Sequence, residues 1–421
     1  MFTRRQLLET GVAAATSSLA IPAFAQKRPI KIGYISPQSG PLSAFSQADK
    51  YMIAQFQKAA LAKGLNVQVL VKDSQSNPNR AADVARELIL RDKVNLILVA
   101  STPETTNPVC TVAEAEQVPV ISSVAPWQSW YVVQQGNPDN PSSWTSFNYV
   151  YHFFWGLEDN VAVFLNMWNS VKTNKSLGAL WPNDGDGNAW ASNYGLPPAA
   201  KKAGYKLTDP GRYQDLTDDF SAQINAFKKN DVEIFTGIPI PPDFTTFWTQ
   251  ASQQGFKPKL VSIAKALLFP ESVAALGKLG HNLTCEVYWT PTFPFHSSLT
   301  GESCADLAAG FSKAAGRQWT QPVGYTHALF ELAADVLKRA GDPTNRDAVA
   351  KAIASTSLDT VVGNIRWGKD NVPAYARKNV AKTPLLGGQW RRQANGSFDL
   401  VIVENGNAPN IPLGGKLETL R

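Results

Sequence analysis

Short apolar runs alternate with amphipathic stretches along most of the chain. In the first half, runs rich in Ile, Val and Leu lie at residues 30–35, 67–71, 96–99 and 118–121, and each has the length of a buried strand. Between them, Tyr51, Phe56 and Ala60 share one helical face, and further helices are predicted at residues 82–91 and 109–116. Because strand and helix alternate, we predict a parallel sheet with helices on both faces.

A polar and aromatic segment, residues 134–155, interrupts this alternation, which then resumes. Strands are predicted at residues 177–180, 232–235 and 260–263, and helices at 189–203, 220–229 and 244–254. A helix-rich tract follows at residues 305–354, and then a tail rich in Gly and Pro. We therefore predict a second α/β unit, with residues 134–155 as the first crossing between the two.

Composition excludes several classes of protein. The chain has 421 residues, 44% of them hydrophobic and 18% charged, which is typical of a folded chain with two domains. No apolar run reaches the ~20 residues of a membrane span. The net charge of +6 comes from scattered Lys and Arg rather than a basic stripe, which argues against nucleic-acid binding. The 12 Trp and 20 Phe suit a ligand site as well as a core.

The N-terminus has the pattern of an export signal. Arg4 and Arg5 precede two leucines, an apolar run follows at residues 11–21, and Ala23-Phe24-Ala25 fits a signal peptidase site. The alternative is a membrane anchor, but the run is short and rich in Ala, Ser and Thr. We therefore predict a cleavable signal peptide of the twin-arginine type over residues 1–25, with Gln26 as the new N-terminus and the bacterial periplasm as the destination.

Three cysteines are too few for a disulfide scaffold. Export makes a bridge between Cys285 and Cys304 possible, and the sequence leaves it open. Cys110 lies in a predicted helix and is expected to be buried.

A search for catalytic motifs finds none. The four histidines share no metal-binding spacing, and there is no nucleophile elbow or phosphate-binding loop. Asp184 to Asn188 resembles the start of a calcium loop, but its twelfth position is Gly195 instead of an acidic residue. We therefore expect a turn or ligand-contacting loop there, no metal and no cofactor. An exported two-lobe α/β chain without catalytic residues indicates binding.

Five segments carry a resemblance to a known family. They are residues 30–35 with the turn Ser39-Gly40-Pro41, Asp73 with Asn77-Pro78 and Ala81-Ala82, residues 118–122, residues 219–221, and residues 361–367. In this order they resemble the solute-binding proteins of ABC transporters of the branched-chain amino acid type, which have the type I periplasmic binding protein fold.

The resemblance implies two doubly wound, parallel-sheet α/β lobes joined by three hinge crossovers. The first lobe would comprise residues 27–152 and 287–367, and the second residues 153–286 and 368–421. The lobes would close on one small solute, and the closed form would dock on an ABC permease with its ATPase at the inner membrane. The chain would act as a monomer. A sensor of the same fold with a signalling partner, and less so an exported enzyme, are the alternatives.

The resemblance also implies a set of ligand contacts. In the first lobe, hydroxyls and N–H groups of two loops would hold a solute carboxylate, with Trp127 beside them. These hydroxyl residues are Ser101, Thr102, Thr105, Thr106, Ser122 and Ser123. The alternative for each is a helix cap or turn. In the second lobe, Asp186 and Trp190 lie near the position of the family's tyrosine contact.

One departure from the family bears on the identity of the solute. Amino-acid binders of the family place an acidic residue against the solute ammonium, where this chain has Lys265. Either Asp186 takes over the ammonium, or the solute is not an α-amino acid. In the second case Lys265 would pair with an acidic group, and Trp127 or Trp190 would stack on the ring of an aromatic or short organic acid.

Overall fold

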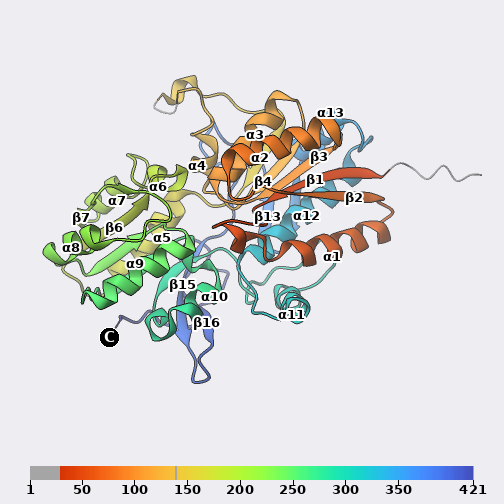
Figure 1. Ribbon diagram of the computed structural model, residues 1–421. Coiled ribbons are helices and arrows are strands. Elements are labelled where there is room, and N and C mark those ends of the chain that lie inside the picture. The colour runs from red at the N-terminus through yellow and green to blue at the C-terminus, as the bar shows by residue number, and fades with distance from the viewer. Residues whose placement is uncertain (1–28, 138–139, 421) are drawn as a thin grey trace, which may run out of the picture.

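The computed structural model describes residues 29–137 and 140–420, so the predicted signal segment lies outside the described residues. Two lobes lie side by side, each with a central sheet between helices (Figure 1). The predicted fold class, two α/β lobes with parallel strands, is confirmed.

The sheet of lobe one has six strands, and every neighbouring pair is parallel. In spatial order the strands are β14 (Val380–Ala381), β5 (Val150–Phe153), β4 (Val120–Ser123), β3 (Leu96–Ala100), β1 (Ile30–Ser36) and β2 (Val67–Asp73). Strand β5 lies within the segment for which the sequence pattern predicted none. Tyr34 and Leu98 face one core and Ile35 and Ile97 another, because helices cover both faces of the sheet.

Helices from both halves of the chain cover this sheet. One face packs against α1 (Asp49–Ala62) and α12 (Pro322–Arg339), and the other against α2 (Pro78–Arg86) and α3 (Pro103–Ala115). Asn77 caps α2, since its side chain accepts a hydrogen bond from the N–H of Arg80, and Pro78 fits the first helical position. The remaining helices of this lobe are α4 (Trp127–Tyr131), α11 (Cys304–Ala315) and α13 (Arg346–Ala354).

The sheet of lobe two is mixed. Its main path is β16 (Phe398–Glu404), β15 (Leu386–Arg392), β11 (Thr284–Val287), β10 (Leu260–Ile263), β9 (Ile234–Gly237), β6 (Ser176–Pro182) and β7 (Lys206–Thr208), and β8 (Arg212–Tyr213) pairs with β6. The pairs β11–β15 and β15–β16 are antiparallel, and the others are parallel. The expected long helix at residues 189–203 is two short helices.

The helices of lobe two lie on both faces of its sheet. They are α5 (Leu157–Asn169), α6 (Gly185–Trp190), α7 (Leu196–Lys202), α8 (Ser221–Lys229), α9 (Pro241–Gln253) and α10 (Pro270–Ala275). Helices α5 and α7 pack on one face, and α8, α9 and α10 on the other.

The described chain passes between the lobes three times, after β5, after β11 and after β14. A small hairpin of β12 (Ser357–Thr360) and β13 (Gly363–Arg366) precedes the last passage. Strand β14 pairs with β5, so the sheet of lobe one extends beyond residue 367, where the sequence resemblance placed the end of that lobe.

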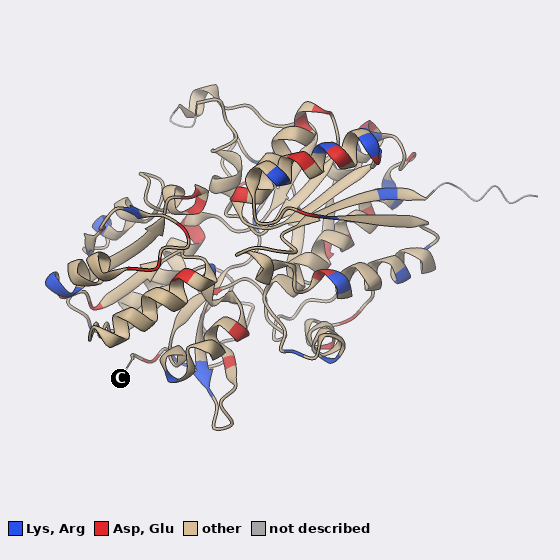
Figure 2. Cartoon of the chain, in the orientation of Figure 1, with Lys and Arg blue, Asp and Glu red and all other residues tan. Residues whose placement is uncertain are grey.

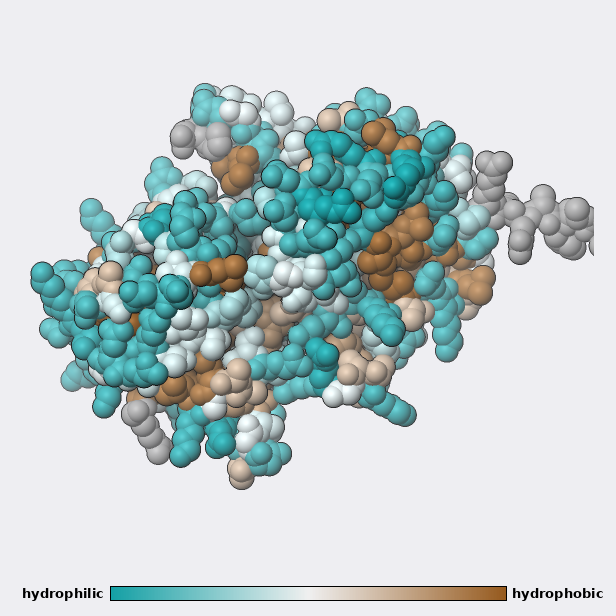
Figure 3. Space-filling model, in the orientation of Figure 1, coloured by the Kyte–Doolittle hydropathy of each residue, from teal (hydrophilic) through white to brown (hydrophobic). Residues whose placement is uncertain are grey.

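All three cysteines are buried and unpaired, so the bridge that the sequence left open between Cys285 and Cys304 is not formed. Within the described residues, no helix combines the length and the apolar character of a membrane span. Polar side chains dominate the face seen in Figure 3, and an apolar area lies over the edge strand β2, where Val71 is 43% exposed.

Candidate functional site

A cavity lies between the two lobes, at the carboxyl ends of their parallel strands, where open α/β sheets bind ligands. In this arrangement of the lobes its volume is about 20 Å³, room for about one water molecule, so a solute needs the lobes to move apart before it can enter. Both lobes contribute to its lining, which consists of Phe45, Thr102, Val124, Pro126, Phe154, Trp155, Asp186, Ile238, Lys265, Leu268, Glu286 and Tyr288. The site therefore depends on how the lobes meet.

Contacts on both sides of the cavity hold the lobes together. On one side, the Glu104 carboxylate of α3 accepts a hydrogen bond from the N–H of Gly185 at the start of α6. On the other side, the rings of Phe45 and Phe269 meet edge to face with centroids 5.0 Å apart. Beside them, Glu271 of lobe two accepts a hydrogen bond of 3.1 Å from the Gln47 side chain of lobe one. The lobes thus enclose the cavity.

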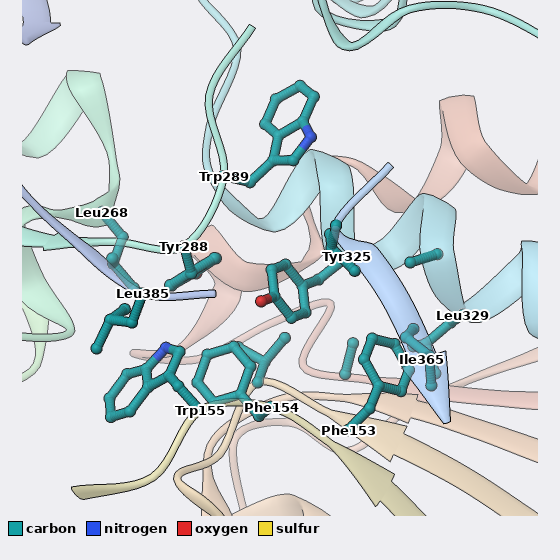
Figure 4. Close-up of a cluster of buried hydrophobic side chains, with 14 of the residues drawn as sticks. Phe153, Phe154, Trp155, Leu268, Tyr288, Trp289, Tyr325, Leu329, Ile365 and Leu385 are labelled. Carbon is teal, nitrogen blue, oxygen red and sulfur yellow. The ribbon is translucent and has the colours of Figure 1, made fainter. Parts of the chain in front are cut away.

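The crossover segments form an aromatic wall. Phe154 and Trp155 follow β5, and Tyr288 follows β11 (Figure 4). The rings of Phe154 and Tyr288 each pack edge to face on Tyr325 of α12, with centroids 5.0 and 4.9 Å away. The Tyr325 hydroxyl donates to Thr383 Oγ1 of the third crossover at 2.6 Å. One side chain therefore contacts all three crossovers, next to the cavity.

Lys265 enters the cavity from a strained turn. Its φ of 62° and ψ of −60° place it at the centre of a γ-turn, which the hydrogen bond from the N–H of Ala266 to the carbonyl of Ala264 closes at 2.7 Å. Such a turn is rare, and strain of this kind persists where the surroundings fix the residue. Here the surroundings are carboxylates: Lys265 Nζ lies 3.1 Å from Asp184 Oδ2 and 2.8 Å from Asp186 Oδ2.

The carboxylates near Lys265 outnumber the single cation. Asp184 and Asp186 lie at the start of α6, and Glu104 and Asp215 interact with the same group of charges. Figure 2 shows acidic segments on the side of lobe two that faces lobe one. Burial lowers the pKa of the Lys265 ammonium, but Asp184 and Asp186 more than offset this effect and raise that pKa above its usual value. Lys265 is therefore a cation whose charge is already balanced within the protein.

Glu286 is the second acidic group of the cavity wall and comes from β11. Its Oε1 accepts a hydrogen bond of 2.9 Å from the backbone N–H of Lys265. Its Oε2 has no hydrogen-bond partner among the described residues, although the side chain is only 2% exposed. Burial raises the pKa of Glu286 to about 8, so the carboxyl group is mostly neutral at pH 7.

Comparisons with known proteins identify the family. A model of the family described as periplasmic binding protein matches residues 29–381. The chain belongs to the periplasmic binding protein family. The resemblance that the sequence motifs carry, to the branched-chain amino acid type with the type I fold, is confirmed.

This periplasmic binding protein is similar to one named relative and shares its fold with two solved structures. It is 23% identical to Leu/Ile/Val-binding protein homolog 4 of Brucella abortus, over 90% of this chain and 88% of that one. The crystal structure of the leucine-binding protein LivK of Thermotoga maritima superposes with a TM-score of 0.72 at 18% identity, covering 90% and 99% of the two chains. A solute-binding protein of an ABC transporter from Rhodopseudomonas palustris, in complex with 3,4-dihydroxybenzoic acid, has a TM-score of 0.69 at 15% identity, covering 91% and 99%.

The structure of this periplasmic binding protein brings three of the expected contact residues to the cavity, namely Thr102, Asp186 and Lys265. Lys265 and Asp186 pair with each other, whereas the sequence offered them as alternative contacts of a solute, Asp186 to an ammonium or Lys265 to an acidic group. Thr102 Oγ1 is buried and has no hydrogen-bond partner in the described chain.

The other hydroxyl residues are used inside lobe one. Thr105 Oγ1 donates to Ser101 Oγ at 2.7 Å, and Thr106 Oγ1 donates to the Ser101 carbonyl at 3.0 Å. Ser122 and Ser123 bond to neighbouring β5, through the Tyr151 carbonyl and His152 in one case and the Phe153 carbonyl in the other. These hydroxyls hold the ends of strands and helices in place and do not line the cavity.

Neither of the two expected tryptophans lines the cavity. Trp127 Nε1 donates to Glu158 Oε1 of α5 at 3.1 Å, which joins the two lobes next to the first crossover. The Trp190 ring is fully buried and packs near Phe164 in the core of lobe two. The tryptophan that lines the cavity is Trp155 instead.

Sequence reasoning missed Glu286, Tyr288 and Trp155 as site residues. A carboxylate inside the apolar run Cys285 to Trp289 was a usable signal, since a buried charged residue in a strand needs a partner or a function. The calcium-like loop is the N-terminus of α6, where the Asp184 side chain accepts a hydrogen bond of 2.6 Å from the N–H of Gly187. Asp184 therefore acts as a helix cap.

Proposed function

We propose that this chain is the periplasmic solute-binding subunit of an ABC importer. The lobes open and close about the three crossovers, and one small solute is captured between them. Closure is driven by the higher affinity of the solute for the closed arrangement. The closed form then docks on the permease, whose ATPase powers uptake.

The observation that carries this proposal is the position of the cavity. Both lobes line it, the crossovers form one of its walls, and the contacts from Glu104 to Gly185 and from Phe45 to Phe269 flank it. A solute inside would touch both lobes at once, which is what hinge closure requires. The buried polar atoms of the walls would give it orientation, as in other small-molecule sites.

Location and partners follow from the same proposal. Residues 1–25 would be removed during export, the mature chain would begin at Gln26, and it would work as a monomer in the periplasm without catalysing a reaction. The mass of the protein recovered from a periplasmic fraction tests the cleavage site.

The experiment that tests the function is a thermal-shift screen of the chain from Gln26 to Arg421. The panel contains branched-chain, aromatic and acidic amino acids, amines, amides, urea, and aromatic and aliphatic carboxylates. A solute at 100 times its dissociation constant stabilises the fold by about 2.7 kcal/mol, which moves the melting temperature by degrees. Small-angle scattering with the active solute should give a smaller radius of gyration than without it.

Uptake measurements separate import from sensing. Cells that lack the chain should lose uptake of the active solute, and a plasmid copy should restore it. Normal uptake in the deletion strain would instead favour a sensor, and chemical change of the solute would favour an enzyme.

A further inference from the structure

The cavity wall contains several buried polar atoms that have no hydrogen-bond partner in the described chain. They are Thr102 Oγ1, Trp155 Nε1, Asp186 Oδ1, Glu286 Oε2 and Tyr288 Oη. Two of these five atoms are carboxylate oxygens, and none belongs to Lys or Arg. A buried polar group without a hydrogen-bond partner destabilises the protein. A solute that forms hydrogen bonds with these groups removes that cost, which favours its binding.

Lys265, the one cation that the described part of the chain places in the cavity wall, is not free for a solute. Lys265 Nζ is held between Asp184 and Asp186 at 3.1 and 2.8 Å, and its backbone N–H is taken by Glu286. A solute carboxylate would have to share this ammonium with two aspartates and approach Glu286 as well. Like charges at such short range disfavour each other strongly where water is excluded.

The start of α3, where the family resemblance placed a carboxylate site, is also unsuited to an anion. Its first residue, Pro103, has no N–H, and its second, Glu104, is acidic. The N–H groups of Thr105 and Thr106 both donate to the carbonyl of Thr102. The start of this helix therefore offers an anion few free N–H groups and already has the Glu104 carboxylate in its first turn.

Resting on the proposed function, we propose that the solute is a small organic cation without a carboxylate, whose protonated amine binds Glu286 Oε2 and Asp186 Oδ1. Each carboxylate already uses its other oxygen, Glu286 toward the Lys265 N–H and Asp186 toward the Lys265 ammonium. The free oxygens accept from the solute, and Thr102 and Tyr288 supply the remaining polar contacts.

The rest of the cavity suits the hydrocarbon part of such a cation. Its walls are Phe45, Phe154, Trp155, Ile238 and Leu268. Aromatic faces attract cations as well as apolar groups, so the wall favours an alkylammonium or arylalkylammonium over a neutral solute of the same shape. The cavity, about 20 Å³ as the lobes lie here, must widen by movement of the lobes to admit such a solute.

Matched probes that differ only in charge test the inference. We would measure binding of 3-methylbutylamine, 3-methylbutanamide, 3-methylbutanoate and leucine, and of benzylamine, benzamide, benzoate and phenylalanine. The amine of at least one set should bind ~10-fold more tightly than its neutral, anionic and zwitterionic analogues, because bonds to an ionised partner are about twice as strong as neutral ones.

A variant locates the contact. Glu286→Gln keeps the oxygen that accepts from the Lys265 N–H and removes the charge, so amine affinity should fall at least ~10-fold. The control is Glu116→Gln, an exposed glutamate at the end of α3 that lies outside the cavity, and it should leave affinity unchanged. If Glu286→Gln and Glu116→Gln bind the amine with equal affinity, Glu286 does not contact the amine.

Proton release gives a second readout that needs no variant. Glu286 faces Asp186 and Lys265, Cys285 precedes it and Tyr288 lies two residues after it, and its carboxyl group is mostly neutral at pH 7. An amine would ionise it and release up to one proton, so the calorimetric binding enthalpy should differ between phosphate and Tris buffers with the sign of proton release. Proton uptake would overturn the inference.

The outcomes separate this inference from the function it rests on. If a carboxylate or an amino acid binds as tightly as the amine, the solute class is wrong and the binding function stands. If no compound of any charge binds, in this set or in the wider panel, both fail.

Discussion

Lys265 combines a strained backbone with a buried charge, and its replacement should be severe. Lys265→Met removes the cation between Asp184 and Asp186 but keeps the length of the side chain. Two buried aspartates would then face each other without compensation, and breaking a buried pair in this way costs about 3–5 kcal/mol. Urea denaturation at pH 7.5 should show a loss of at least ~3 kcal/mol. Lys278→Met, at an exposed lysine, should change stability by less than ~0.5 kcal/mol.

A loss below ~1 kcal/mol for Lys265→Met would contradict this account of the cluster. The same variant should recover part of its stability at pH 5, because burial raises the pKa of Asp186 and its protonation removes the repulsion between the two carboxylates.

Site residues could be predicted from the sequence only where they directly follow a parallel strand. Thr102, Asp186 and Lys265 follow parallel strands, and the sheet rule places such residues at the cleft. The roles of Ser101, Thr105 and Ser122 depend on which hydrogen-bonding groups lie nearest in three dimensions. In the structure their hydroxyls form hydrogen bonds within lobe one. Glu286 escaped prediction because it lies inside a strand, whereas the expected contacts were sought in the loops that follow strands. One sequence gives no information on those distances.

The junction of α4 and α5 next to the first crossover provides a test at the level of elements. Glu158 at the start of α5 accepts from Trp127 Nε1 at 3.1 Å and pairs with Lys382, which follows β14, at 2.8 Å. Trp127→Phe removes a hydrogen bond to a carboxylate, which is worth ~2 kcal/mol. Chemical denaturation should show this loss, while solute affinity changes less than ~3-fold.

Trp144→Phe is the matched control for Trp127→Phe. Trp144 Nε1 donates to the carbonyl of Asn137 within a loop of lobe one, so its loss should affect stability by less than ~1 kcal/mol. A tenfold loss of affinity in Trp127→Phe without a change in stability would return Trp127 to the solute site that the sequence predicted.

Regular alternation predicted most elements, and the misses have physical causes. Strand β15 begins Leu386-Gly387-Gly388, which is typical of a turn. These glycines are required by close packing: a Cβ on Gly387 would lie 2.7 Å from Met167 Sδ of α5, and one on Gly388 would lie 2.4 Å from Val287 Cγ2 of β11. Strand β5 was missed because four residues in an aromatic, Asn-rich segment give no period. Tertiary contacts decide both cases.

Glu104 provides a contact that the proposed closure of the two lobes would use. Its carboxylate accepts from the N–H of Gly185 across the cleft, so Glu104→Ala removes a charged hydrogen bond that separation of the lobes would break. A bond of this kind is worth ~1.5–3 kcal/mol, and 1.4 kcal/mol corresponds to tenfold in affinity. Stopped-flow measurements should show the bound solute leaving ~10-fold faster, with association little changed.

A glutamate on the same helix provides the control. Glu114 accepts from the N–H groups of Asn148 and Tyr149, each at 2.8 Å and both within lobe one. Glu114→Ala should therefore lower stability without changing the rate at which solute leaves. If both variants release solute at the wild-type rate, the contact at Gly185 does not contribute to closure.

The stability of the fold as a whole should fall as the pH rises from 6.5 to 8. Burial raises the pKa of Glu286 to about 8, and those of Glu331 and Asp49 to about 7, whereas unfolded carboxyls titrate near ~4. Between these values the folded state binds more protons than the unfolded state, so the free energy of unfolding decreases with pH. Burial lowers the pKa values of His152 and His327 to about 3 and 4. These histidines therefore make stability rise with pH, but mainly below ~6.5, where unfolded histidine gains its proton.

Urea denaturation at constant ionic strength should therefore give a free energy of unfolding on the order of 2 kcal/mol larger at pH 6.5 than at pH 8. Glu286→Gln should make this dependence shallower, since the amide has no proton to lose. Stability that is constant or rises over this interval would show that the buried carboxyls are ionised in the folded protein. In that case Glu286 would be a charged group before any solute arrives, and binding of an amine would release no proton.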